Sequence, residues 1–372
     1  MSIVRSDNKL LTQCINEMAR LVIERGGKVH PAACIEEQDG AIRVICRDRQ
    51  AAGQQMFGVP NTLLVPIDGI DWTDSEDVLE LRQEPAHLSA DQRRMLGLFM
   101  TLYNAASKMA DMKTKATRVV LRDSGCAAQI ATVTYVNPNA AREPIATAES
   151  LMRTRFYSNS MAPGDLANAR VLMPLVDFAN HHHAGALFRQ DAYNLSVDIA
   201  QPLQTDECFY SYAAFLDPLG NALAHGFVDH DSPFACSVPV TVDIPSFGRF
   251  EIAGKRARPS YKIDLPKVDL TENGITVSHL TGDVRKPHLL HNTLRLITSA
   301  YAKKRGLSDD AFTMALAELR QALLIANRQK LSAFSAYMQQ RRDLPIGSVL
   351  ASAGEYQLAN LERILSHQSA LV

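Results

Sequence analysis

Residues 171–231 decide the fold, and they read VLMPLVDFANHHHAGALFRQDAYNLSVDIAQPLQTDECFYSYAAFLDPLGNALAHGFVDHD. An apolar run ends in DFANH at residues 177–181, and a stretch with alternating apolar residues follows it. Next come the acidic turn Asp206-Glu207, an aromatic run ending at Tyr212 and the pair Gly226-Phe227. Because alternation with a period of two is typical of half-buried strands, this region predicts short strands joined by polar turns.

The residues before this region predict a helix, several strands and then a mostly helical stretch. Apolar residues at helical spacing predict a first amphipathic helix, namely Leu11, Ile15, Met18 and Val22. Residues 41–65 have strand-like composition, and the stretch from about 70 to 165 is mostly helical. Ser89 followed by Gln92 predicts a capped helix start. A hairpin is predicted within the helical stretch, with strands at 119–121 and 130–136.

The sequence predicts helices for the rest of the chain after Pro287. Apolar residues recur there at helical spacing, namely Phe312, Leu316, Leu319 and Leu323, and later Leu358, Leu361 and Leu365. Ser308, followed by Asp309 and Asp310, predicts a helix start, since acidic groups complement the exposed amides of a first turn. We therefore expect a helical C-terminal domain over residues 288–372 and an α+β core over residues 1–287, interrupted by a helical insertion.

The bulk composition narrows the class of protein. Of the 372 residues, 46% are hydrophobic and 21% are charged, which is ordinary for a globular chain. Lysine and arginine number 39 and aspartate and glutamate 40, so no excess positive charge indicates a nucleic-acid or anionic-membrane partner. The near-neutral charge does not oppose a homo-oligomer. No apolar stretch is close to the about 18 residues that a membrane-spanning helix needs, and the first residues do not resemble a signal peptide. We therefore expect a cytoplasmic protein.

Two motifs carry a resemblance to a known family. The stretch PLVDFANH, residues 174–181, resembles the PLADLINH motif of SET-domain proteins of the Rubisco large-subunit methyltransferase type. The stretch DECFYSY with the later HGFVD, residues 206–229, is similar to that family's GEQVYIQY and YGFIE. Weaker similarity extends to FGVPNTLLVP, residues 57–66, and LMRTRF, residues 151–156. The helical C-terminal residues match the family's substrate-binding domain in position.

The resemblance implies a fold, a cofactor and a reaction. The implied fold is the SET domain, an α+β arrangement of short β-sheets in which a late segment is threaded through an earlier one, with a helical C-terminal domain. The implied cofactor is S-adenosylmethionine, and the implied reaction is in-line transfer of its methyl group to a protein lysine held at the helical domain. Such a transfer depends mostly on positioning of the nucleophile.

The resemblance also assigns roles to individual residues. Arg155 matches the arginine that binds the cofactor carboxylate, a charge-assisted contact. Asn180 and His181 match the pair that contacts the cofactor's amino group and adenine, and Phe227 lies where an aromatic residue packs beside the cofactor. Tyr212 matches a tyrosine that lines the methyl-transfer pore. Without the resemblance, the same residues would be interpreted as strand-end caps, a surface ion pair and core aromatics.

Two positions depart from the family pattern. His225 stands directly before Gly226-Phe227, where the family has its catalytic tyrosine. Three outcomes follow: His225 acts as acceptor or base, the chemistry at the sulfonium differs, or the cofactor binds without turnover. The family's Gly-x-Gly motif falls on Ala41 and Arg43, although a shift by one residue would bring in Gly40. Without such a shift, Arg43 would crowd the cofactor or contact its carboxylate.

Two other classes of protein remain open. The run from His181 to His183, with His225 and His230, offers ligands for zinc or iron, but adjacent residues on a strand point to opposite faces and no established metal spacing is present. We therefore assign no metal ligand. A non-catalytic interaction protein, with the helical domain binding a partner, is the other alternative, and the methyl acceptor could also be a small molecule.

Overall fold

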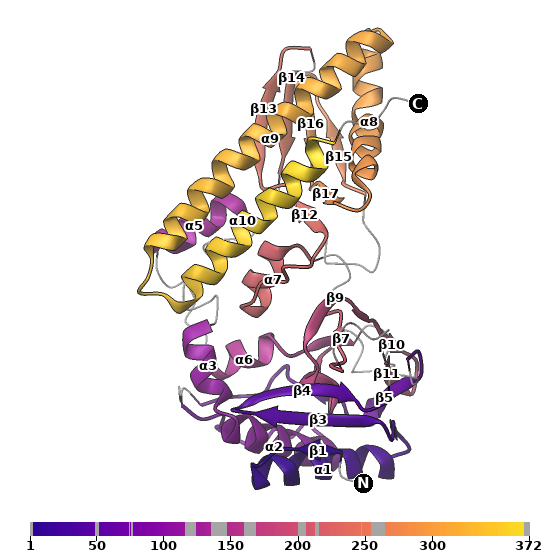
Figure 1. Ribbon diagram of the computed structural model, residues 1–372, viewed down its shortest axis with the longest axis vertical. Helices are drawn as coiled ribbons and strands as arrows, with labels where there is room; N and C mark the ends of the chain where they lie inside the picture. The colour runs from indigo at the N-terminus through magenta and orange to yellow at the C-terminus, as the bar shows by residue number, and fades with distance from the viewer. Residues whose placement is uncertain are drawn as a thin grey trace. The chain divides into compact units, whose positions relative to one another are not determined.

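The computed structural model describes residues 3–48, 52–73, 75, 77–115, 124–134, 147–159, 169–199, 206–212, 216–246, 248–253 and 265–367. The chain forms two compact units, which are described separately (Figure 1). The first unit comprises Met1–Ala116 and Ile145–Tyr212, and the second comprises Thr117–Pro144 and Ala213–Val372.

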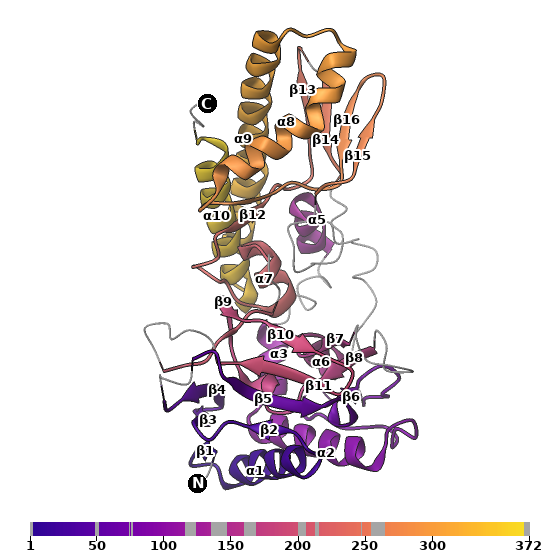
Figure 2. The ribbon, with the colours of Figure 1, turned by 90° about the vertical axis from the view of Figure 1, so that its right-hand side faces the viewer.

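The first unit contains several helices, of which α1 and α2 have capped starts and buried apolar residues. These helices are α1 (Lys9–Glu24), α2 (Ala90–Ala105), α3 (Lys108–Lys115) and α6 (Thr147–Arg153). The Asn8 side chain accepts hydrogen bonds from the first turn of α1, and Ser89 and Gln92 form a reciprocal capping box on α2. Helices α1 and α2 pack against each other (Figure 2).

The first unit also contains three short sheets. One has the order β1-β3-β4, from Val4–Arg5, Ala33–Gln38 and Ala41–Cys46. The second has the order β10-β11-β5-β2, from Phe188–Gln190, Asn194–Asp198, Gln55–Pro60 and Lys28–Val29. The third has the order β6-β8-β7, from Val65–Pro66, Ala169–Leu172 and Tyr157–Asn159. Strand β9 (His181–Ala186) lies outside these sheets, and short 3₁₀ turns occur at Asn61–Leu63 (η2) and Val176–Phe178 (η4).

The second unit combines strands with long helices. Its helices are α5 (Ser124–Val133), α7 (Pro218–His225), α8 (Pro287–Lys304), α9 (Asp309–Gln340) and α10 (Pro345–Leu365). Its strands are β12 (Phe234–Cys236), β13 (Val240–Ile244), β14 (Gly248–Ile252), β15 (Val268–Leu270), β16 (Gly274–Val277) and β17 (Thr281–Asp283). Helices α9 and α10 run alongside each other, and β13 packs against α9 (Figures 1 and 2). One apolar core joins these helices to the sheet β13-β14-β16-β15.

Several sequence predictions are confirmed and two are wrong. The α+β class with short sheets, the first helix and the capped starts of α2 and α9 are confirmed. The strand predicted at 130–136 is wrong, because Ser124–Val133 is helical and buries Cys126, Ile130 and Val133 on one face. Its partner strand at 119–121 lies outside the described residues. Residues 171–231, for which short strands joined by polar turns were predicted, also contain α7.

The predicted domain bounds, 1–287 and 288–372, stay a prediction. Helix α8 begins at Pro287, the position where the sequence indicates the change to helices. Within the described residues, no helix is both long and apolar enough to cross a membrane.

Candidate functional site

Residues 206–211 join the two halves of the candidate site in the first unit. On one side they pair with β4, since Cys46 N donates to Asp206 O at 2.9 Å and Cys208 N donates to Val44 O at 2.8 Å. On the other side Tyr210 N donates to Asn180 O at 2.9 Å, and bridges join Tyr210 to both His181 and Ala186. The segment therefore lies between β4 and β9 and brings DECFYSY, residues 206–212, next to the end of PLVDFANH.

The chain enters β9 through a strained turn. Leu175 has a φ of 66° and a ψ of −40°, and Val176 N donates to Pro174 O at 2.8 Å. This combination is a γ-turn with positive φ, a rare conformation for a residue with a side chain. Strain of this kind costs about 1–3 kcal/mol and persists only where the surroundings impose it. The buried 3₁₀ turn η4 follows at once and places Asp177 inside the unit.

Arg155 and Asp177 form a largely buried ion pair. Arg155 Nη1 lies 3.3 Å from Asp177 Oδ2 and donates to the Asp177 carbonyl at 3.3 Å. The two side chains are 25% and 5% exposed. The Tyr103 hydroxyl donates to Asp177 Oδ2, and the Arg155 guanidinium lies 5.2 Å from the centre of the Tyr103 ring. Burial raises the pKa of Asp177 and lowers the pKa of Arg155, because each charged form loses hydration.

Tyr212 is fastened to the stretch from Ala179 to His181. Its hydroxyl donates to Ala179 O at 2.6 Å, and its backbone N–H donates to His181 Nδ1 at 3.0 Å. The His181 and Tyr212 rings lie 5.1 Å apart. Burial raises the pKa of the Tyr212 hydroxyl, and the nearby charge of Arg155 opposes that shift. The hydroxyl therefore keeps its proton at neutral pH.

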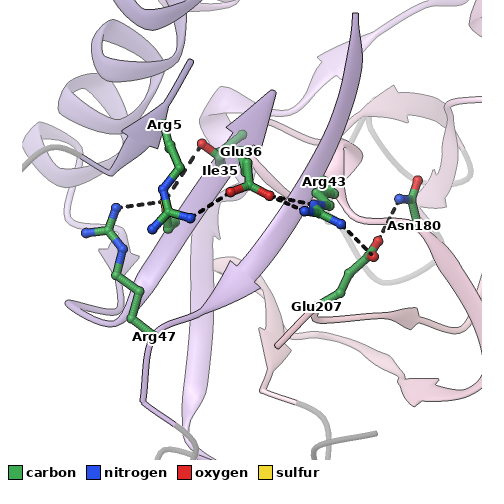
Figure 3. Close-up of polar contacts among 8 residues, drawn as sticks. Arg5, Ile35, Glu36, Arg43, Arg47, Asn180 and Glu207 are labelled. Carbon is green, nitrogen blue, oxygen red and sulfur yellow. Dashed lines mark hydrogen bonds and ion pairs between the residues drawn. The ribbon is translucent and has the colours of Figure 1, made fainter. Parts of the chain in front are cut away.

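A row of charged residues connects Asn180 to the sheet β1-β3-β4 (Figure 3). Asn180 Nδ2 donates to Glu207 Oε1 at 2.7 Å, and Glu207 Oε2 lies 4.0 Å from Arg43 Nη1. Arg43 Nε donates to Glu36 Oε2 at 2.7 Å, and Arg5 Nη1 donates to Glu36 Oε1 at 2.8 Å. Positive and negative charges alternate along the row.

The positions that would match the family's Gly-x-Gly lie on the exposed side of β4. Ala41 and Arg43 are both exposed, and Arg43 reaches along the sheet to Glu36. Gly40 has a φ of 79° and forms the turn of the β3-β4 hairpin with Asp39, whose φ is 52°. Two positive φ values are typical of a two-residue hairpin turn, so Gly40 is required there.

His225 and Phe227 belong to the second unit. His225 is the last residue of α7, Gly226 ends the helix with a φ of 77°, and the His225 and Phe227 rings lie 6.0 Å apart. The first unit thus brings together Arg155, Asn180, His181 and Tyr212. The predicted roles of all six site residues stay predictions.

The histidine run does not form a metal cluster. The His182 ring lies 4.4 Å from that of His183, and His182 Nδ1 accepts from Ala184 N at 3.0 Å, while His181 contacts Tyr212. Among the described residues, no three His, Cys, Asp or Glu side chains are grouped so that they could hold a metal ion.

Asp177, Glu207 and Tyr103 also contact the predicted site residues, although the sequence indicated no cofactor-binding or catalytic role for them. Asp177 stands inside the PLVDFANH motif and Glu207 in the acidic turn, so both were visible as polar residues beside apolar strands. Tyr103 had no such signal, because its contact with Asp177 joins residues 74 positions apart. Helix α7 was signalled by Asp217-Pro218 at its start and Gly226 at its end.

Comparison with known proteins finds similarity among solved structures alone. No family model matches the sequence, and no curated protein matches it. The chain is similar to the SET domain of LSMT bound to lysine and AdoHcy, with a TM-score of 0.42 and 12% identity, covering 95% of this chain and 89% of that chain. It is also similar to Rubisco LSMT bound to AdoMet, with a TM-score of 0.44 and 13% identity, covering 95% of this chain and 91% of that chain.

Proposed function

We propose that the first unit binds S-adenosylmethionine and that the protein transfers its methyl group to a protein lysine. The observation that carries the proposal is the attachment of Tyr212 to Ala179 and His181. Through it, residues of both family-like motifs meet in one place. Arg155 lies beside them through its contacts with Asp177.

Arg155 is suited to bind a carboxylate. Its Nε is buried and has no hydrogen-bond partner among the described residues, while Nη1 contacts Asp177. A guanidinium carries five donors, so this residue retains N–H groups for a ligand. A buried donor without a partner is unfavourable by about 1–3 kcal/mol, which a ligand carboxylate would offset.

Arg43 is compatible with the same ligand. A side chain where the family has glycine would obstruct the cofactor if it reached Asn180, but Arg43 Nε donates to Glu36 on the neighbouring strand, and Arg43 Nη1 lies 4.0 Å from Glu207. Asn180 itself is exposed, so its side chain is accessible to a ligand. The residues present therefore fit the cofactor.

The cofactor, when bound, supplies a methyl group on a positively charged sulfur. Tyr212 would serve as a fixed oxygen near such a group, since its proton is committed to Ala179 and its lone pairs can accept weak C–H···O contacts. The raised pKa of Tyr212 means that it does not act as a base. Deprotonation of the acceptor lysine is the role we propose for His225, because a neutral imidazole has one nitrogen that can accept a proton.

Transfer is tested with S-adenosylmethionine carrying a labelled methyl group and a total protein extract as acceptor. We expect labelled methyl-lysine in the hydrolysed protein and a large loss of label with His225→Ala. The control is His230→Ala, which removes a nearby exposed histidine whose ring contacts Tyr356. Equal rates in His225→Ala and the wild type would exclude the role of His225, and label in a small-molecule fraction would exclude the protein acceptor.

The alternative is a protein that binds the cofactor and a partner without turnover. The histidine at position 225, in place of the family's tyrosine, favours this alternative. It predicts cofactor binding without label in any acceptor.

A further inference from the structure

The side-chain amide of Asn180 has a fixed orientation. Asn180 directly precedes β9 and donates through Nδ2 to Glu207 Oε1 at 2.7 Å. An ionised carboxylate has acceptors and no donors, so the amide must turn its NH₂ group toward Glu207. The carbonyl oxygen is therefore the atom that Asn180 offers to a ligand.

Glu207 is in turn fixed by the backbone and by Arg43. It pairs with Ile45 on β4, and Arg43, two residues along the same strand, lies on the same face. The Glu207 side chain is 13% exposed, and its Oε2 lies 4.0 Å from Arg43 Nη1 (Figure 3).

Arg43 neutralises Glu36 more completely than it neutralises Glu207. Two nitrogens of Arg43, Nε and Nη2, donate to Glu36 Oε2, whereas the approach to Glu207 is a single 4.0 Å contact. The hydrogen bond from Arg43 lowers the pKa of Glu36, and the hydrogen bond to Glu36 raises the pKa of Arg43. Glu207 therefore keeps much of its negative charge beside Asn180.

This end of the row presents two acceptors side by side, a carbonyl oxygen and a carboxylate. Such a pair suits a cationic donor such as a primary ammonium group. We infer that Glu207 is a positioning residue that orients Asn180 and makes this part of the site selective for the α-ammonium group of the ligand. The inference rests on the proposed function, since it assigns the ammonium to S-adenosylmethionine or its product. Arg43 moderates that selectivity by neutralising part of the charge.

The inference is tested with two ligands that differ only in the ammonium group. The ligands are S-adenosylhomocysteine and its deaminated analogue, each titrated calorimetrically into the wild type, Glu207→Ala and Arg43→Met. We expect the wild type to prefer S-adenosylhomocysteine. Glu207→Ala should lose about tenfold in affinity for it, the order of one charge-assisted hydrogen bond, and little for the analogue.

Arg43→Met should change the preference for the ammonium-bearing ligand in the direction opposite to Glu207→Ala. Without the guanidinium, the Glu207 carboxylate is no longer partly neutralised, so the preference for the ammonium-bearing ligand should increase. If Glu207 only held residues 206–211 against β4, the two substitutions would not change the ligand preference in opposite directions. Circular dichroism and thermal unfolding of both variants verify that they are folded.

The results separate this inference from the proposed function. Equal weakening of both ligands by Glu207→Ala, or no weakening at all, would overturn the positioning role while leaving cofactor binding intact. An unchanged or reduced preference in Arg43→Met would also overturn it. A wild type that binds neither S-adenosylhomocysteine nor S-adenosylmethionine would overturn the proposed function and, with it, this inference.

Discussion

The Tyr212 hydroxyl donates a hydrogen bond of 2.6 Å to the carbonyl of Ala179, a residue 33 positions earlier in the chain. The backbone N–H of Tyr212 is bound at the same time by His181 Nδ1. Tyr212 is therefore held at both its backbone and its side chain by a stretch of three residues. This attachment turns two distant motifs into one structural element of the first unit.

Removal of the Tyr212 hydroxyl should lower the free energy of unfolding by about 1–2 kcal/mol, because Ala179 is buried and its carbonyl would lose this donor. Urea unfolding of Tyr212→Phe measures the change. The matched control is Tyr210→Phe. The Tyr210 hydroxyl is buried and has no partner within the described part of the chain, so its removal should be neutral or stabilising. Equal destabilisation by both substitutions would contradict the hydrogen bond to Ala179.

Removal of Arg155 should destabilise the protein and make its stability depend more strongly on pH. Arg155→Met leaves Asp177 buried without its cation, a loss of about 3 kcal/mol at pH 8. Burial raises the pKa of the Asp177 carboxyl, so the folded variant binds a proton more tightly than the unfolded chain. The free energy of unfolding should therefore fall as pH rises from the unfolded pKa of about 4 through the higher folded pKa.

The measurement is urea unfolding of Arg155→Met and the wild type at pH 5 and pH 8. The two proteins should be closer in stability at pH 5, where the variant's carboxyl is more protonated. Arg155→Met combined with Asp177→Asn supplies the control, because it carries no carboxyl and should lose this pH dependence. A variant that is less stable relative to the wild type at pH 5 than at pH 8 would contradict the assignment.

Gly185→Ala should separate β9 from residues 206–211. A Cβ atom at Gly185 would lie 2.7 Å from the carbonyl oxygen of Phe209 and 2.7 Å from the carbonyl carbon of Tyr210. Backbone atoms cannot rotate away, so the segments must move apart, with a loss of about 1–3 kcal/mol and weaker cofactor binding. Gly97→Ala is the control, since Gly97 lies inside α2 with nothing within 4 Å of the new atom. It should stabilise the protein by up to about 1 kcal/mol.

Asn221→Leu should stabilise the second unit. Asn221 is fully buried on α7, and neither atom of its amide has a hydrogen-bond partner among the residues described. An apolar side chain of similar size removes this unfavourable burial, so the free energy of unfolding should rise by about 1 kcal/mol. Thermal and urea unfolding measure the change. A loss of more than about 1 kcal/mol would mean that the amide is hydrogen-bonded in solution.

The elements that the sequence predicted well are those set by local chemistry. The capping box of Ser89 and Gln92 and the Ser308 cap concern residues three positions apart, and both are present. The stretch with alternating apolar residues after residue 181 includes Leu195 and Val197, which occupy buried positions of β11. Such signals depend on a single turn or strand and can be identified from neighbouring residues.

The predictions that failed depended on weak or competing local signals. Ile130 and Val133 are β-branched and suggested a strand, yet they pack at helical spacing in α5 against the core of the second unit. Helix α7 was missed although its capping residues were present. In the candidate site, Asp177 and Glu207 stand out in the sequence as polar residues beside apolar ones. Their partners come from distant parts of the chain: Tyr103 contacts Asp177, and Arg43 contacts Glu207. Contacts of that kind follow from tertiary packing, which one sequence does not specify locally.

Cofactor binding is measured by calorimetric titration of the metal-free protein with S-adenosylmethionine, performed on the wild type and on Arg155→Met. We predict micromolar binding at one site in the wild type and at least a tenfold loss of affinity in the variant, because the carboxylate loses a charge-assisted contact. Absence of heat in the wild type, with binding appearing only after zinc or iron is added, would contradict the account and direct attention to the histidines instead.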